Sequence, residues 1–139
     1  VAEIKSNGRL RLSPVGGFNA NNAEAHNCRV YTYDGQIYEG TIQLADASLH
    51  VNKEYSTTQR TFQSVEVVLD EPVTSKDDVK ALGITNGCFV CADPNLVVTN
   101  SGYIKSRFLD DKLSAAIYLA MQNISAKITS HRFARFISI

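Results

Sequence analysis

Two adjacent carboxylates, Asp110 and Asp111, are the residues of this sequence whose type and spacing best suit chemistry. An apolar segment over residues 103–109 predicts a strand before them. The segment after them has its apolar residues at helical spacing, which predicts an amphipathic helix with one apolar stripe: Leu113, Ala116, Ile117, Ala120, Met121 and Ile124. Carboxylates at a strand end, beside the positive end of a helix dipole, suit divalent metal ions. The alternative is that both aspartates only cap the helix.

Four segments in a fixed order, ending at this aspartate pair, carry a family resemblance. They are residues 7–18, which include Gly16-Gly17-Phe18, residues 28–42, residues 67–90, and Phe108-Leu109-Asp110-Asp111-Lys112. Together they resemble the glutamyl and deblocking (tetrahedral, TET-type) aminopeptidases, dinuclear metallo-aminopeptidases of clan MH.

The resemblance implies a role for each aspartate. Asp110 would bridge two divalent metal ions, zinc or cobalt, between which a water molecule is activated to remove N-terminal residues from peptides. Asp111 would orient the loop from the second layer around the metals, and the peptide bond between the two residues is often cis in this clan. The family's His-x-Asp motif, its Glu-Glu pair, a further acidic ligand and a final His do not occur in this sequence. We therefore expect both ends to be cuts through a larger fold, no catalytic residue within this chain, and no activity or bound metal for the chain alone.

The resemblance also implies a mixed α+β architecture, in which a small β-barrel domain, PDZ-like, is inserted into an α/β aminopeptidase-like sheet. Residues 18–100 would be the barrel, which serves oligomerisation. Residues 1–17 and 101–139 would be strands and a helix of the catalytic domain, incomplete here.

Local patterns predict a strand-rich chain. Asn7-Gly8 and Asp34-Gly35 each predict a hairpin with a two-residue turn. Ser75 is a good N-cap for a helix that ends at Gly83, and residues 51–62 form a polar, exposed loop. The predicted strands cover residues 2–6, 9–12, 28–33, 36–44, 65–69, 88–92, 96–99, 103–109 and 133–139.

Cys88-Phe89-Val90-Cys91 has the spacing of half a zinc site or of a redox pair. In a strand, however, positions i and i+3 point to opposite faces, and the sequence has no second such pair. We expect buried structural cysteines. The odd count of 3 cysteines argues against a disulfide framework and favours the cytoplasm. His50, between Leu49 and Val51, is either a surface histidine or, by resemblance, part of a barrel loop near the active-site mouth.

The balance of positive and negative charge limits the classes of partner that the protein is expected to bind. Lys and Arg number 14 and Asp and Glu 14, so no basic footprint for nucleic acid or for an anionic membrane surface is present, and no apolar run has the length of a membrane span. Two functions remain. The first is a metal-dependent aminopeptidase, a homo-oligomer acting on peptides, of which this chain is an inactive portion. The second is a non-enzymatic oligomerisation or peptide-binding module derived from that family. The residue preference of the enzyme is not readable here.

Overall fold

A computed structural model describes residues 1–136, with side chains up to residue 127. The chain divides into two compact units, Val1–Asp93 and Pro94–Ile139. The family resemblance implies divisions after residues 17 and 100. The assignment of those parts to a catalytic domain and an inserted domain stays a prediction, although residues 1–17 share a compact unit with the middle of the chain.

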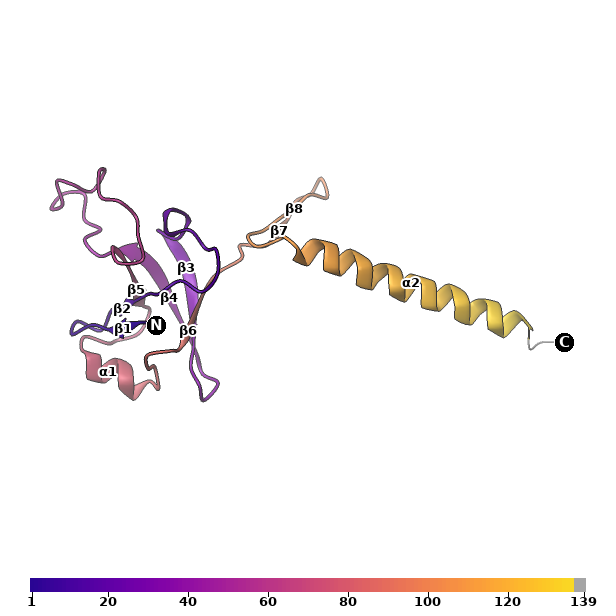
Figure 1. Cartoon of the computed structure of the whole chain (residues 1–139), viewed down its shortest axis with the longest axis horizontal. Coiled ribbons are helices and arrows are strands. Elements are labelled where there is room, and N and C mark those ends of the chain that lie inside the picture. The colour runs from indigo at the N-terminus through magenta and orange to yellow at the C-terminus, as the bar shows by residue number, and fades with distance from the viewer. Residues whose placement is uncertain (137–139) are drawn as a thin grey trace. The chain divides into compact units, whose positions relative to one another are not determined.

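The first unit is built on a six-stranded antiparallel sheet with the order β1-β2-β5-β4-β3-β6 (Figure 1). Its strands are β1 (Glu3–Ile4), β2 (Leu10–Arg11), β3 (His26–Tyr31), β4 (Ile37–Leu44), β5 (Val65–Leu69) and β6 (Phe89–Ala92). A short 3₁₀ helix, η1 (Ala20–Asn22), and one α-helix, α1 (Lys76–Ala81), complete the unit. Val67 of β5 lies opposite Leu10 of β2 on one side and Ile42 of β4 on the other, so β5 joins the N-terminal hairpin to the central strands.

The sheet curls so that its two end strands approach each other. The Gly87 N–H, just before β6, donates to the Val1 carbonyl oxygen, just before β1, at 2.8 Å. The first unit is therefore a curled antiparallel sheet with a helix, and the whole chain is mixed α and β. The PDZ-like barrel insertion stays a prediction.

Both predicted hairpins form, but each turn is longer than predicted. Lys5 N–H donates to the Arg9 carbonyl oxygen at 2.9 Å, and Thr32 N–H donates to that of Gln36 at 3.0 Å. These bonds leave residues 6–8 and 33–35 in the turns, so the expected two-residue turns are wrong. Gly8 and Gly35 have φ of 78° and 86°, the left-handed conformation that closes a three-residue hairpin loop.

In the core, side chains of the sheet pack together with Val79 of α1. The Ser75 hydroxyl accepts a hydrogen bond from Asp78 N–H at 3.2 Å, and the Asp78 carboxylate accepts one from Ser75 N–H at 2.9 Å, which confirms the predicted N-cap. Val79 of α1 is fully buried. The other fully buried large side chains are Leu10, Val30, Ile42, Leu44, Val65, Val67 and Ile84. Each stabilises the fold by about 1.5–3 kcal/mol relative to an exposed position.

A charged side chain, Glu66, is also buried in the first unit, with 3% of it exposed. It pairs with Lys5, and the Arg9 guanidinium lies 3.8 Å away from its other oxygen. Arg9 donates in addition to the Ala45 carbonyl oxygen at 2.8 Å. Two cations from the N-terminal hairpin therefore compensate one carboxylate of β5, which fixes the hairpin against the sheet.

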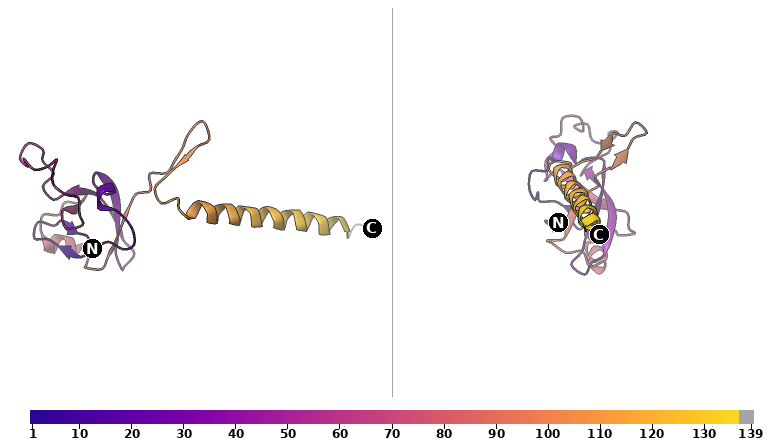
Figure 2. Two further views of the ribbon diagram at one scale, coloured as in Figure 1. Left: turned by 45° about the horizontal axis from the view of Figure 1, so that its top comes forward. Right: turned by 90° about the vertical axis from the view of Figure 1, so that its right-hand side faces the viewer.

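The second unit contains the hairpin of β7 (Val97–Val98) and β8 (Ile104–Lys105), followed by one long helix, α2 (Lys112–Phe136) (Figure 2). The predicted strand over residues 103–109 is therefore wrong beyond Lys105. Phe108 has a φ of 61°, which no extended strand accommodates. No helix in the described part of the chain is long and apolar enough to cross a membrane.

The helix begins as predicted but runs much further than residue 124. The strand predicted over residues 133–139 is wrong for residues 133–136, which belong to α2, and residues 137–139 lie outside the described part. No Gly or Pro interrupts residues 112–136. A helix satisfies its backbone hydrogen bonds within itself, whereas a strand there requires a neighbouring strand.

Candidate metal-ligand site

The segment that carries the two aspartates is held in place from the chain preceding β7. Arg107 N–H and the Ser106 hydroxyl both donate to the Pro94 carbonyl oxygen, at 2.7 Å and 3.0 Å. These bonds turn the chain away from the β8 strand direction. The aspartates are therefore the last two residues of an irregular segment, residues 106–111, and do not lie at a strand end.

Phe108 and Lys112 shape this turn. Lys112 Nζ donates to the Phe108 carbonyl oxygen at 3.3 Å and lies 5.7 Å from the centre of the Phe108 ring. A left-handed residue that is not Gly costs of order 1–3 kcal/mol and persists where its surroundings enforce it, often at functional sites. In the Asp-Asp-Lys sequence, the lysine thus stabilises the turn that presents the aspartates.

Asp110 and Asp111 are both exposed, and the peptide bond between them is cis, as the resemblance implies. The helix start is supported by backbone groups: Leu113 N–H donates to the Leu109 carbonyl oxygen at 2.8 Å, and Ala115 N–H to that of Asp111 at 3.1 Å. Within residues 1–136, neither aspartate side chain accepts a hydrogen bond from the helix backbone. Among the described residues, the capping alternative therefore lacks the bond that defines a side-chain cap.

The donor set does not make a complete metal site. In the described part of the chain, no three side chains of His, Cys, Asp or Glu gather closely enough to hold a metal ion. Two exposed carboxylates supply oxygen atoms that suit a divalent cation but cannot alone fix two of them. The role of Asp110 as a bridging ligand and of Asp111 as an orienting residue stays a prediction.

The histidines do not complete the site within the described residues. His50 is exposed in the long loop between β4 and β5, and His26 is the first residue of β3. Both belong to the first unit, whereas Asp110 belongs to the second.

In the part of the chain that the structure describes, the cysteines do not gather with other donor side chains into a group that could hold a metal ion. All three are free thiols. Cys28 is buried, and Cys88 is buried as predicted. The predicted burial is wrong for Cys91, because burial alternates along β6 and leaves this side chain exposed. Burial raises the pKa of the Cys28 thiol to about 12. Cys88 Sγ accepts from Thr85 N–H at 3.3 Å and serves the turn before β6.

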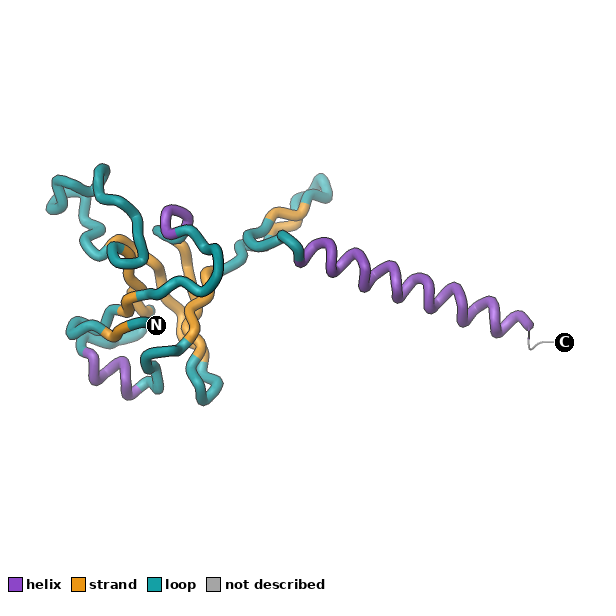
Figure 3. Tube along the Cα trace, viewed as in Figure 1, coloured by secondary structure: helices purple, strands orange, loops and turns teal. Residues whose placement is uncertain are grey.

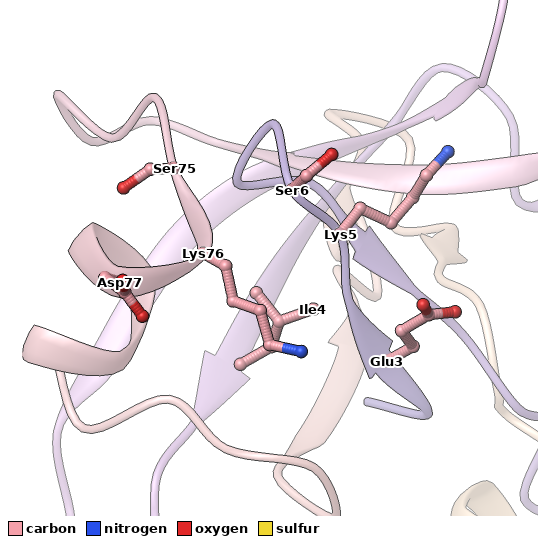
Figure 4. A pocket seen from close by; sticks show the side chains of 7 residues that line it. All are labelled: Glu3, Ile4, Lys5, Ser6, Ser75, Lys76 and Asp77. Atoms are coloured by element: carbon pink, nitrogen blue, oxygen red, sulfur yellow. The ribbon is translucent and has the colours of Figure 1, made fainter.

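A hollow of about 520 Å³ lies between the N-terminal hairpin and the start of α1 (Figure 4). Its lining residues are Glu3, Ile4, Lys5, Ser6, Ser75, Lys76 and Asp77. Most of its charged groups already have partners. Glu3 pairs with Arg11 at 2.9 Å, Lys5 with Glu66, and Asp77 with Lys80 at 3.2 Å. This hollow could not be predicted from the sequence, because the two segments that line it are about seventy residues apart.

Comparisons with known proteins confirm the family resemblance. The profile described as M42 glutamyl aminopeptidase matches residues 1–138, so the chain belongs to this family. It is 41% identical over 137 residues to the putative aminopeptidase YhfE of Bacillus subtilis (strain 168), covering 94% of this chain and 40% of that protein. The chain thus spans less than half the length of this relative.

Solved structures show the same fold. The aminopeptidase APDkam598 of the archaeon Desulfurococcus kamchatkensis is similar with a TM-score of 0.60 and 24% identity, over 72% of this chain and 26% of that one. The TET1 peptidase of Pyrococcus horikoshii, which can assemble into a tetrahedron or a large octahedral shell, has a TM-score of 0.62 and 25% identity, over 80% and 32%. The TET aminopeptidase of Thaumarchaeota archaeon SCGC AB-539-E09 has a TM-score of 0.62 and 18% identity, over 73% and 28%.

Proposed function

We propose that the protein to which this chain belongs is a metal-dependent aminopeptidase that removes N-terminal residues from peptides. The family and the aminopeptidase relative support the activity. The observation that carries the site is the exposed Asp110–Asp111 pair, presented by a turn that Lys112 and Phe108 stabilise, with no bond to the helix backbone.

Asp110 supplies one ligand of the proposed metal site. The remaining ligands come from parts of the protein outside this chain, since the described residues hold no further group of the right kind nearby. Divalent ions in such a site would lower the pKa of a bound water molecule and polarise the scissile carbonyl group. Asp111, joined directly to Asp110, orients the turn and so sets the direction of the Asp110 carboxylate.

The proposal includes the domain arrangement and the assembly. Residues 18–100 form an inserted domain that serves oligomerisation, and residues 1–17 and 101–139 belong to the catalytic domain. The shell-forming assembly of the similar Pyrococcus horikoshii peptidase supports a homo-oligomer. Exposed apolar side chains of α2, including Leu113, Ile117 and Met121, support a helix that is covered in the whole protein.

The test is the substitution Asp110→Asn in the full-length protein. Asn keeps the size and most of the hydrogen bonding but removes the charge that holds cations. Aminopeptidase activity on peptides should fall by orders of magnitude, and the bound zinc or cobalt measured by elemental analysis should decrease. Thermal stability of the metal-free protein should change little.

Asp77→Asn is the matched control, because Asp77 is an exposed aspartate on α1 that pairs with Lys80 on the same helix. It should change neither activity nor metal content. If Asp110 were only a helix cap, Asn would replace it nearly as well, since both are good caps. Near-normal activity of the Asp110→Asn enzyme would therefore leave the capping role and remove the metal role. A full-length protein without peptidase activity would favour the binding-module alternative.

A further inference from the structure

The connection between β4 and β5, residues 45–64, contains no helix or strand (Figure 3). Connections of this length without secondary structure are uncommon in compact domains, and those that are ordered usually have a function. Ala45 N–H donates to the Ser64 carbonyl oxygen at 2.8 Å, which closes the base of the loop. Phe62, close to that base, packs against the core. We call residues 46–60, beyond this anchor, the arm.

The arm is folded on itself by short-range bonds. Asn52 N–H donates to the Ser48 carbonyl oxygen and Thr58 N–H to that of Glu54, both at 2.8 Å. Its most distant part is not held by burial, because Leu49 and Val51 are 64% and 75% exposed. Interactions other than apolar burial must therefore fix the position of the arm against the sheet.

A single arginine of the arm, Arg60, makes hydrogen bonds both to Glu24 outside the arm and to other residues of the arm. Arg60 Nε donates to one carboxylate oxygen of Glu24 at 2.7 Å, and Nη2 donates to the other at 3.4 Å. Its Nη1 donates to the carbonyl oxygens of Tyr55 and Thr58, at 2.8 Å and 2.7 Å. The planar guanidinium group thus joins three points at once, which a lysine could not do.

Glu24 receives a further bond from the arm, since the Tyr55 hydroxyl donates to it at 3.1 Å. The Arg60 guanidinium also lies 4.9 Å from the centre of the Tyr55 ring. Only 17% of the Arg60 side chain and 19% of that of Glu24 are exposed. The hydrogen bond from Arg60 lowers the pKa of Glu24, against the opposing effect of burial.

The segment that carries Glu24 is itself fixed. Ala23 is fully buried, and Ala25 N–H donates to the Ile42 carbonyl oxygen of β4 at 2.8 Å. Among the described residues, the hydrogen bonds that connect the arm to residues distant in the sequence all end on Glu24.

We propose that Glu24 and Arg60 form a latch that holds the arm in one conformation, and that the arm opens as a unit when the latch is broken while the sheet stays folded. The latch thereby determines where Leu49, His50 and Val51 are presented. This inference does not depend on the aminopeptidase proposal, because the arm and the latch belong to the first unit alone.

The test is amide hydrogen exchange of the full-length protein, resolved by peptide. In Glu24→Gln and in Arg60→Lys, amides of residues 51–58 should exchange about tenfold faster or more, because charge-assisted, forked hydrogen bonds are lost. Exchange in β3, β4 and β5 should be unchanged. Arg60→Lys separates the fork from the charge, since it keeps only the charge. Trypsin cleavage after Lys53, in the arm, should be faster in both variants.

The control is Lys80→Gln, which breaks the exposed pair of Lys80 with Asp77 and should leave the arm unchanged. Three results would overturn the latch. The arm could exchange at the same rate in the variants as in the wild type, it could be unprotected already in the wild type, or the sheet could lose protection together with the arm. The last result would make the pair a stabiliser of the whole unit.

Discussion

Gly40 lies in the middle of β4, where the structure leaves no room for a side chain. It faces Cys28 of β3 on one side and Leu69 of β5 on the other. A Cβ atom there would lie 2.6 Å from the Val68 carbonyl oxygen, 3.1 Å from Val67 Cγ1 and 3.3 Å from Leu69 Cα. Two of these three atoms belong to the backbone of β5, so the strand itself would have to move.

The expected effect of Gly40→Ala follows from two opposing contributions. Overpacking of a tightly packed core costs about 1–3 kcal/mol. Replacing Gly within a strand removes an entropic penalty of about 0.5–1 kcal/mol. The difference between these ranges is about 0–2.5 kcal/mol. We expect a net destabilisation of about 2 kcal/mol, near the upper end, because the closest contact is a backbone atom that cannot rotate away.

The assay is thermal unfolding of the full-length protein together with amide hydrogen exchange of β4 and β5. Gly40→Ala should lower the transition temperature by a few degrees and accelerate exchange in these two strands. Gly17→Ala is the matched control, because no atom lies within 4 Å of the position of its Cβ. It should be neutral or slightly stabilising. Equal stability of the two variants would refute the steric argument.

Three further predictions concern other parts of the first unit. In the native full-length protein, a maleimide should label the exposed Cys91 rapidly but not Cys28, whose pKa of about 12 leaves almost no thiolate at neutral pH; equal labelling of both, located by peptide mapping, would contradict the burial. Ser75→Ala should destabilise the protein by about 1 kcal/mol and accelerate exchange of the Asp78 amide, because the N-cap bond is lost; unchanged exchange would show that the cap is unimportant. Hydrogen bonds from Thr74 and Ser75 hold the pKa of Asp78 below its ordinary value of 3.8, so its stabilising contribution is present above that value and disappears as the pH falls through the lower, folded pKa; an Asp78 carboxyl that titrates at or above 3.8 by NMR would contradict this.

Local sequence patterns predicted only part of the candidate site. Asp110 and Asp111 could be identified from the sequence, because two adjacent carboxylates before a predicted helix can be recognised without knowledge of the fold. The turn that presents them could not be predicted, since it depends on the Pro94 carbonyl oxygen, which accepts hydrogen bonds from Ser106 and Arg107. The strand pattern over residues 103–109 contains no information about such a contact.

The secondary structure was likewise predictable only where it depends on residues close together in the sequence. The positions of the hairpins at Gly8 and Gly35, though not the lengths of their turns, and the cap at Ser75 were predictable. The interactions that form them connect residues within about five positions of each other. The C-terminal end of α2 could not be predicted. Residues 133–136 are mostly apolar, which also fits a strand, and only the presence or absence of a neighbouring strand decides which structure forms.

Interactions between distant segments were decided by the tertiary structure alone. The sequence shows Glu66 as one residue of a β-branched strand, and nothing in it indicates that Lys5 and Arg9 will meet that carboxylate. The same holds for Glu24 and Arg60, which are separated by 36 positions and are brought together by the pairing of β4 with β3 and β5. Composition and spacing determine which short elements a chain can form. Which charges are buried together, and which loop is fixed, depends on the order of strands in the sheet, which no local pattern contains.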